Sequence, residues 1–278
     1  MKKNIYILVI SLMFVSWTEA KESENSWAEL NLKGNAKSMK EKKYEVAEKI
    51  DNFQKEKLTD SNIFVFNDKG NIIEKYIYKP DGSLKMKSTY KYDGNGKMIE
   101  QNGYNENGSL EEKSTYKYDG NGKKIEQNRY NENGNLEKKS TYKYDGNGNI
   151  IEEHKYNPDG SLYFKSIYMN DSNGNIIEEK RCKSDGSLDW RYTWRYDING
   201  NTIETNWYKA DGSLTGKDTY KYDDNANQIE RNRYNTDGSL RAKYTYKYDY
   251  DKNFNWIKKI ELENDVPLSV WEREIEYF

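Results

Sequence analysis

The chain has one histidine, His154, and one cysteine, Cys182, among the residue types that most often carry catalysis. His154 stands at a position that is usually Asn or Tyr elsewhere in the chain, and Cys182 replaces a recurrent Tyr. We interpret His154 as a half-buried strand residue and Cys182 as a small buried apolar residue. An odd cysteine in an exported protein could also form an intermolecular bridge. No Ser/His/Asp set, phosphate-binding loop or zinc spacing is found. We therefore expect no enzyme activity and no cofactor.

The segment Asp145-Gly-Asn-Gly-Asn149 has the residue types of a calcium loop. Its spacing fails, because Ile150 stands where an EF-hand needs Gly and Tyr156 where it needs Glu. Asp, Asn and Gly are also the residues of tight turns. We interpret the segment as a turn and expect no metal site.

Carboxylates recur at one fixed spacing. A catalytic acid or base is expected once, in a distinctive local environment, whereas a repeated row is typical of a solvated surface. The recurrence therefore argues against an active site. The row consists of Glu74, Glu100, Glu126, Glu152, Glu178, Glu204 and Glu230.

Aromatic residues are the strongest candidates for a binding site. They are densest at Phe164, Trp190, Tyr192, Trp194 and Trp207. One interpretation makes them the core of the central units. The other makes them an exposed platform for sugar rings or a groove for a protein partner. Trp207 has the opposite parity from the recurrent Tyr beside it, so we expect it to be the most exposed of the five.

These residues are placed by a repeat of 26 residues. A fixed period of this length indicates a repeat architecture. Each unit has two turn signals, exemplified by Asn157-Pro-Asp-Gly160 and Asp145–Gly148, in which Gly supplies a positive φ. The strand 187–196 alternates apolar and polar residues, as a strand with one wet face does. The period is shown by Leu84, Leu110, Leu136, Leu162, Leu188, Leu214 and Leu240.

The sequence predicts an all-β fold: an antiparallel meander of 26-residue β-hairpins forming a twisted or spirally curled sheet. Turn tips are expected at Gly82, Gly108, Gly134, Gly160, Gly186, Gly212 and Gly238. Whether the sheet is open, spiral or closed stays undecided. No second layer is available to cover an aromatic face, so we expect the sheet to curl with that face inward.

Pairing across the turns can also be predicted. Tyr156 should face Leu162, and His154 should face Phe164, which would put the recurrent Tyr of 78, 104, 130, 208 and 234 on the aromatic face with Leu188 and Trp190. A row of Ile, for example Ile99 and Ile151, falls on the opposite face by parity. Either a bulge changes the register there, or the second face is partly covered.

The chain divides into four parts by pattern. Residues 1–20 have the charged start, apolar run and small-residue end of a signal peptide, with cleavage expected after Ala20. Residues 21–66 form a polar leading segment and a capping hairpin with strands Ala36–Val46 and Asn62–Phe66 around a connection that could be briefly helical. Residues 67–249 are the regular array. Residues 250–278 form a closing hairpin, with Pro267 in its turn and Val270–Phe278 as an edge strand.

The elements TyrLysTyrAspGlyAsnGly and AspGlySerLeu resemble YD repeats of the Rhs type over residues 67–249. The resemblance implies a sheet of β-hairpins. In that family such hairpins wind into a spiral shell, often around a toxin. This sequence differs in its longer period, its smaller number of units and its lack of a toxin-like C-terminal domain, so those functions do not carry over.

Composition narrows the class of function. The chain has 278 residues, 26 of them Tyr, with 33% charged residues and a net charge of −2. Lys and Glu are interspersed, so nucleic acid is not an expected partner. We expect an exported, non-enzymatic scaffold, periplasmic, cell-surface or secreted, that binds a protein or glycan and has no membrane span after signal removal. The alternatives are an outer-membrane-associated or transmembrane β-barrel, of which the Tyr-rich face and a mean hydropathy of −1.20 disfavour the transmembrane form, and a fragment-like relative of Rhs toxin shells.

Overall fold

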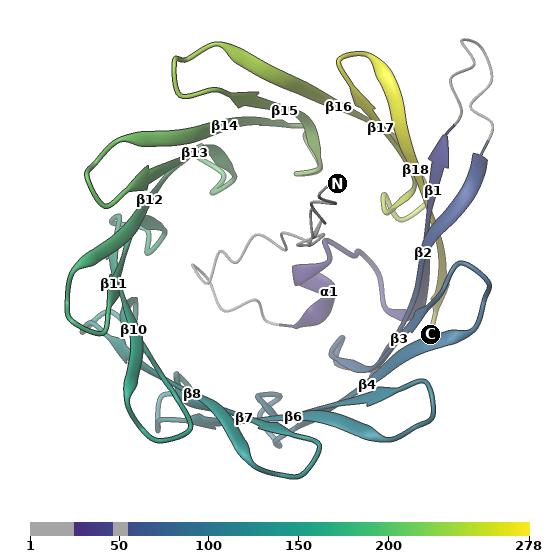
Figure 1. The fold of residues 1–278 in the computed structure, drawn as a ribbon. Helices are drawn as coiled ribbons and strands as arrows, with labels where there is room; N and C mark the ends of the chain where they lie inside the picture. Colours follow the sequence, from purple (N-terminus) through teal and green to yellow (C-terminus); the bar gives the residue numbers. More distant parts are fainter. Residues whose placement is uncertain (1–24, 47–54) are drawn as a thin grey trace, which may run out of the picture.

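The computed structural model describes residues 25–46 and 55–278. A short helix and eighteen strands follow one another along the chain (Figure 1). The elements are α1 (Ser26–Glu29), β1 (Ala36–Val46), β2 (Lys55–Phe66), β3 (Ile72–Tyr78), β4 (Leu84–Tyr92), β5 (Met98–Asn105), β6 (Leu110–Tyr118), β7 (Lys124–Asn131), β8 (Leu136–Tyr144), β9 (Ile150–Tyr156), β10 (Leu162–Asn170), β11 (Ile176–Lys183), β12 (Leu188–Tyr196), β13 (Thr202–Lys209), β14 (Leu214–Tyr222), β15 (Gln228–Tyr234), β16 (Leu240–Tyr250), β17 (Trp256–Glu263) and β18 (Val266–Tyr277).

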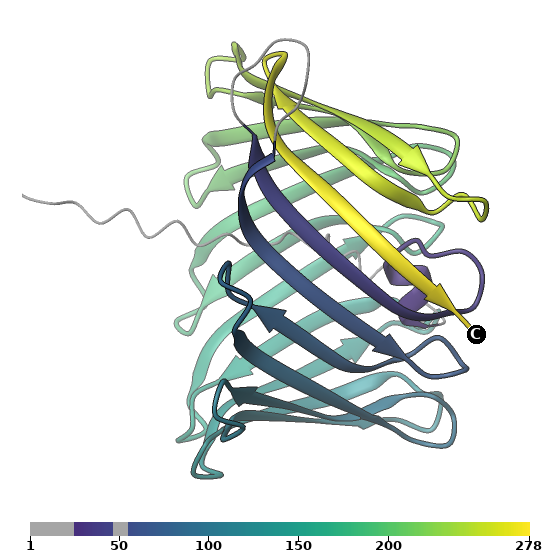
Figure 2. The same cartoon turned by 90° about the vertical axis from the view of Figure 1, so that its right-hand side faces the viewer.

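The strands form one antiparallel sheet that closes into a barrel. Each strand pairs with the next along the chain, and β1 also pairs with β18 from Ala36↔Tyr277 to Glu45↔Ser269. Figure 2 shows these two strands side by side, crossing the wall at a slant. The predicted antiparallel meander is confirmed, but the twisted or spiral sheet is wrong. Closure pairs the free edges that an open sheet would expose.

The two kinds of turn lie at opposite ends of the hairpins. In the loop after β9, the Asn157 N–H donates to Ser161 O at 2.9 Å and the Gly160 N–H donates to Asn157 O at 3.0 Å. Gly160 has a φ of +84°, and the other six predicted tip glycines also have positive φ. This is a type I turn closed by a Gly bulge. The predicted turn positions are confirmed.

Two β-bulges in each regular unit set the register. Near the Asp-Gly-Asn-Gly turns, Lys91 pairs with Glu100 and Tyr92 with Met98, which leaves Ile99 as the extra residue. The same shift occurs at the equivalent Ile of the other units, for example at Ile151. Of the two alternatives left open for the Ile row, the structure shows the bulge. Ile99 itself is 40% exposed.

The second bulge changes which residues share a face. Tyr156 pairs with Leu162 as predicted, but Phe164 pairs with Lys155, and His154 pairs with Lys165 instead of Phe164. Tyr163 is the extra residue. A slip of one residue moves side chains to the other face of a sheet. The expectation that the recurrent Tyr lies on the aromatic face is thus wrong.

The same bulge removes Leu188 from the predicted aromatic row of β12. Cys182 pairs with Leu188, whereas its neighbour Arg181 pairs with Trp190. Adjacent strand residues point to opposite faces. Leu188 and Trp190 therefore lie on different faces, and Trp190, Tyr192, Trp194 and Tyr196 keep the predicted alternation.

The first and last hairpins complete the wall. β1 has its predicted bounds, but β2 begins at Lys55, so residues 55–60 are strand where a brief helix was considered. Pro267 lies within β18, and the turn is formed by Asn264 and Asp265, which have φ of 49° and 67°. The last strand is not an edge, because it pairs with β1. The predicted signal peptide and its cleavage site lie outside the described residues.

The segment that contains α1 identifies the inner face of the wall. Figure 1 shows α1 inside the ring of strands. Trp27 and Leu32 pack with buried Met39, Phe64 and Phe66, which therefore face the lumen. The Trp27 N–H donates to Gly70 O at 3.1 Å. This contact ties the segment to a turn at one end of the barrel.

Among residues 25–46 and 55–278, no helix has the length and apolar character needed to cross a membrane.

Candidate functional site

The outer face carries a belt of ion pairs. Residues that pair directly across strands share a face, so the recurrent Glu row lies outside with the Lys and Thr residues of the following strands. Glu100 lies 2.7 Å from both Lys91 and Lys113, measured between carboxylate oxygens and Nζ. Lys113 and Lys91 together lower the pKa of Glu100 to about 2. The predicted solvated row is thus an ordered belt around the barrel.

The inner face differs from unit to unit. The predicted candidates Phe164, Trp190, Tyr192, Trp194 and Trp207 all face the lumen, since their cross-strand partners include the inward residues Arg181 and Lys155. All five side chains are half-buried. They are neither a sealed core nor a fully exposed platform.

The aromatic rings form a contiguous cluster on neighbouring strands. Ring centroids lie 4.1 Å apart for Trp190 and Tyr192, 5.7 Å for Tyr192 and Trp194, and 6.4 Å for Tyr192 and Trp207. Trp207 lies on the opposite face from Tyr208, as its parity predicted, but it is half-buried and packs on Tyr192, so the expectation that it is exposed is wrong. Phe164 joins the cluster through a shared cation. The Arg181 guanidinium lies 3.9 Å from the Phe164 ring and 5.3 Å from the Trp190 ring.

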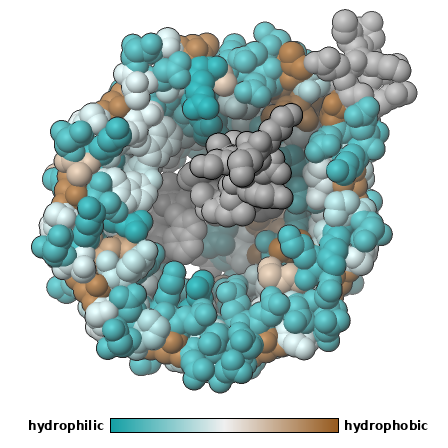
Figure 3. Space-filling model, in the orientation of Figure 1, coloured by the Kyte–Doolittle hydropathy of each residue, from teal (hydrophilic) through white to brown (hydrophobic). Residues whose placement is uncertain are grey.

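A hollow of about 640 Å³ opens beside this cluster on the lumen wall. It extends over β7 to β12 and combines aromatic, cationic and acidic side chains. Figure 3 shows the molecule as a ring around a central opening, with hydrophilic residues over most of its rim. The charged residues that line the hollow, together with one aromatic residue between them, are Arg129, Lys138, Glu153, Lys155, Phe164, Glu179 and Arg181.

The acidic groups of the hollow are held by neighbours. Glu153 lies 3.3 Å from Lys155 and accepts a hydrogen bond from Tyr168 at 3.3 Å. Glu179 accepts a hydrogen bond from the Ser166 hydroxyl at 2.7 Å. Burial raises the pKa of the Glu179 carboxyl above its usual value, and the bond from Ser166 opposes this shift. Hydrogen-bond acceptors and cations therefore alternate along the wall.

His154 and Cys182 do not enter this site. His154 Nε2 lies 3.2 Å from Glu152 and its Nδ1 lies 3.2 Å from the Tyr156 hydroxyl, on the outer face. It is half-buried, as predicted. Cys182 is a free thiol that is also half-buried, so the expectation of a buried residue is wrong.

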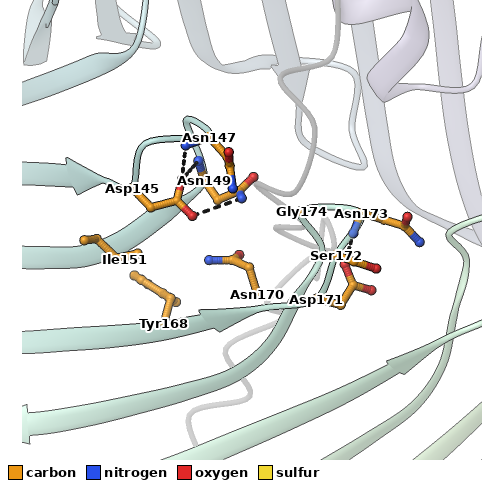
Figure 4. A pocket seen from close by; sticks show the side chains of 10 residues that line it. All are labelled: Asp145, Asn147, Asn149, Ile151, Tyr168, Asn170, Asp171, Ser172, Asn173 and Gly174. Carbon is orange, nitrogen blue, oxygen red and sulfur yellow. Dashed lines mark hydrogen bonds between the residues drawn. The ribbon is translucent and has the colours of Figure 1, made fainter.

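The Asp145 turn forms a second hollow, of about 700 Å³, at one end of the barrel (Figure 4). Asp145 Oδ1 accepts from the backbone N–H of Asn147 at 2.9 Å and of Asn149 at 2.8 Å. Asn170 stands where other units have a Tyr, and its amide donates to Ile150 O at 2.7 Å. Since Asn is the shorter residue, space remains beside the turn. Within the described residues, no group of three or more His, Cys, Asp or Glu could hold a metal ion.

The cations of the lumen hollow were not among the predicted site residues. Arg129, Lys155 and Arg181 occupy one repeat position, at which Ile77, Gly103, Trp207 and Arg233 stand in other units. The sequence does mark this position, because its residue type changes from unit to unit while most other positions of the repeat are constant. It was missed because the register that brings these residues to the lumen depends on a bulge.

Comparison with known proteins gives limited guidance. A family model described as an uncharacterised protein matches residues 32–142. No curated protein matches the chain. A porin-like protein from Bacteroides uniformis is similar at 12% identity and a TM-score of 0.44, over 87% of this chain and 96% of that one.

Two further solved structures are similar to this chain. A porin-like protein from Bacteroides vulgatus has 15% identity and a TM-score of 0.42, over 71% of this chain and 95% of that one. The Photorhabdus luminescens Tc holotoxin pore has 12% identity and a TM-score of 0.30, over 78% of this chain but only 15% of that one.

Proposed function

We propose that this protein is an exported, non-enzymatic binding scaffold that holds its ligand, in the first place a glycan, against the inner wall of the barrel. The observation that carries the proposal is the half-buried cluster of Trp190, Tyr192, Trp194 and Trp207 beside a hollow of about 640 Å³. Flat aromatic faces beside hydrogen-bonding side chains are the usual composition of a ligand site. A barrel of this strand number is also too wide for side chains to fill.

The outer face favours an aqueous surrounding over a lipid one. Around the barrel, Glu100, Glu126 and Glu230 each lie between two Lys side chains within 3.3 Å. Charged side chains on a lipid-facing wall are costly. The alternative of a transmembrane barrel therefore has no support from the belt. Kinship with Rhs toxin shells is a further proposal, which rests on the hairpin units alone.

A glycan array with the mature chain, residues 21–278, tests the proposal. We expect binding by the wild type and loss of binding in Trp190→Ala. The matched control is Tyr208→Ala, because Tyr208 lies on the outer face, where the Arg191 guanidinium lies 4.2 Å from its ring. Equal binding by all three proteins, or binding by none, would contradict the proposal. If a protein binds the wild type but not Trp190→Ala, the ligand of the lumen is a protein and not a glycan.

A further inference from the structure

Two rows of lumen residues lie directly opposite one another at the same height in every unit. One row is in the strand before each Asn-x-Asp-Gly turn and the other is in the strand after it. Their identities change around the barrel, whereas the turns and the outer Glu row recur. The pairs are Ile77↔Met86, Gly103↔Glu112, Arg129↔Lys138, Lys155↔Phe164, Arg181↔Trp190, Trp207↔Gly216 and Arg233↔Ala242.

The variation has no evident structural cause. A residue that only builds the hairpin should recur, as the turn Gly and the Glu of the outer belt do. Three successive hairpins, β7–β8, β9–β10 and β11–β12, instead bring together Arg129, Lys138, Lys155 and Arg181, with Phe164 and Trp190 between them. We name these six residues the lumen arc. In Figure 1 the arc follows the wall from β7 at the bottom of the ring to β12 at its left, whereas the segment that contains α1 packs against β2.

The cations of the arc are not fully neutralised. Lys138 is exposed and has no ion-pair partner among the described residues. Arg129 lies 3.3 Å from Glu137, and Arg181 lies 3.7 Å from Asp189. On the outer belt, by contrast, Glu126 lies within 2.8 Å of both Lys117 and Lys139. The arc therefore offers free positive charge inside the barrel.

From β9 to β12, the aromatic residues of the arc alternate with its cations. Lys155 Nζ lies 5.0 Å from the Phe164 ring, and Arg181 lies between the rings of Phe164 and Trp190. Neighbouring hairpins repeat at about 10 Å, two strand spacings, which is comparable to the length of a disaccharide. A ligand that fits would present apolar ring faces and acidic groups at a similar interval.

We propose that the lumen arc binds an acidic polysaccharide, with its sugar rings on Phe164 and Trp190 and its carboxylate groups on Arg129, Lys138, Lys155 and Arg181. This rests on the proposed function and adds the class of glycan. Arg forms paired hydrogen bonds to carboxylates, and Lys acts as a point charge. Glu153 and Glu179, which line the hollow, add hydrogen-bond acceptors for sugar hydroxyls.

Single-stranded nucleic acid would also use aromatic and cationic groups, but the surroundings of the arc disfavour it. Glu137, Glu153, Glu179 and Asp189 lie on or beside the same wall. A phosphate at every nucleotide would meet these carboxylates, and such sites usually have a strongly basic groove. A sugar chain with spaced acidic groups and many hydroxyls suits this wall better, because its carboxylates can pair with the cations and its hydroxyls can donate to the carboxylates.

The test is calorimetric titration of the mature chain with an oligogalacturonate, a malto-oligosaccharide of equal length and an oligothymidylate. We expect binding of the oligogalacturonate that weakens with salt. Lys138→Gln should weaken it about tenfold, since a hydrogen bond to a charged group contributes about 1.5 kcal/mol or more. Lys139→Gln is the matched control, because the adjacent Lys139 lies on the outer belt, 2.8 Å from Glu126.

The outcomes separate this inference from the proposed function. Equal loss in the two Lys variants, or preferential binding of oligothymidylate, would overturn the acidic glycan. The malto-oligosaccharide could instead bind tightly, with binding lost in Trp190→Ala but kept in Lys138→Gln. This result would overturn the acidic polysaccharide and would still support the proposed function, a glycan bound in the lumen. Binding of none of the three probes would remove the acidic polysaccharide, and the glycan array then decides whether the lumen binds any sugar.

Discussion

Asp218 is a charged residue in a row of the inner wall that is otherwise mostly Ser. It is fully buried, and the row also contains buried Ser88, Ser114, Ser140 and Ser166. Its Oδ2 accepts a hydrogen bond from Arg231 Nε at 2.7 Å, and its Oδ1 lies 3.4 Å from Arg233 Nε. In the hairpin of β4 and β5, the residues equivalent to Asp218 and the two arginines are the uncharged Ser88, Gln101 and Gly103. This unit therefore replaces a neutral contact with a buried ion pair.

Asp218→Asn should lower the free energy of unfolding by about 2–4 kcal/mol, because it leaves two partly buried guanidinium groups without their counter-charge. Restoring the residues of another unit, in Asp218→Ser/Arg231→Gln, should recover part of that loss. Urea denaturation of the three proteins measures both changes. A double variant less stable than the single one would show that the ion pair is not what Asp218 supplies.

Trp190→Ala should cost about 1–3 kcal/mol of unfolding free energy. Full burial of the ring would give about 3–5 kcal/mol, but Trp190 is only half-buried on the lumen wall. Its contact with Tyr192 at 4.1 Å and with Arg181 explains the remaining stabilisation. Thermal and chemical denaturation measure the change. A cost near zero would mean that the ring makes no packing contribution, and a cost above about 4 kcal/mol would make it core.

The aromatic candidates could be predicted from the sequence, but their cationic neighbours could not. Trp190 and Trp207 stand out as residues, but parity predicts opposite faces for them, and they share the lumen face only because of the bulges. Arg181 and Lys155 look like ordinary charged strand residues until the register is known. In a strand with one wet face, parity predicts the outer side for them, and the bulge at Tyr163 reverses this assignment for Lys155.

At the scale of the hairpin, turn chemistry is encoded locally and the bulges are not. Asn157, Pro158 and Gly160 specify the loop through their own φ preferences, and the loop has the predicted form. The bulge at Tyr163 has no comparable residue signature, because its repeat position holds Lys85, Glu111, Glu137, Asp189, Thr215 or Arg241 in other units. It follows from how the loop and the twisted strands fit together, which no single residue specifies.

Gly160→Val should destabilise the protein by about 1–3 kcal/mol, because a β-branched residue resists the positive φ of +84° found there. No atom lies within 4 Å of the position that a Cβ would occupy, so a steric clash does not contribute. Gly160→Asn, which tolerates this region, is the control and should lose much less. If Val and Asn cost the same, the backbone conformation is not the cause.

Ala226→Gly tests the same principle in the opposite direction. Ala226 has a φ of 61° at a position where most units have Gly. Because Gly adopts a positive φ without strain, the substitution should raise the free energy of unfolding by about 1 kcal/mol. The greater conformational entropy of Gly in the unfolded chain reduces this gain. Thermal unfolding of the single variant measures it. A lower melting temperature would show that the unfolded-state term is the larger one.

At the scale of the whole molecule, the ion-pair belt links stability to acid pH. The pKa of Glu126 is about 2 because of Lys117 and Lys139, and that of Glu152 is about 2 because of Lys143 and Lys165. The ordinary value is 4.5. A carboxylate with a lowered pKa stabilises the fold above its unfolded-state pKa and loses that contribution as the pH falls through its folded-state pKa.

We therefore expect the melting temperature to fall between about pH 4.5 and pH 2, and the fall to be smaller in Glu126→Gln/Glu152→Gln. Glu132→Gln, in an exposed turn, is the control and should behave as the wild type. Differential scanning calorimetry at several pH values gives the slopes. Equal slopes in all three proteins would mean that the belt does not control acid stability.

Closure of the barrel was not predictable from one unit, because it depends on where the first and last strands meet. The irregular ends suggested caps, and β18 was expected at an edge. Instead, the longer strands β1 and β18 pair along most of their length. Arg273 Nε donates to Glu41 at 2.9 Å across this seam, and Val270 is 1% exposed.

The repeat predicts which deletions the barrel tolerates. Removing residues 93–118, one period of 26 residues that contains β5 and β6, joins Tyr92 to Asp119 and recreates the TyrAsp turn. The register is preserved and the two ends can still meet, so we expect a smaller, closed and monomeric barrel.

Removing residues 264–278 deletes β18 and leaves β1 and β17 as long unpaired edges, which promote association. Size-exclusion chromatography with light scattering should find the first variant monomeric and the second aggregated. Monomeric behaviour of both would mean that the seam is not what keeps this sheet from associating.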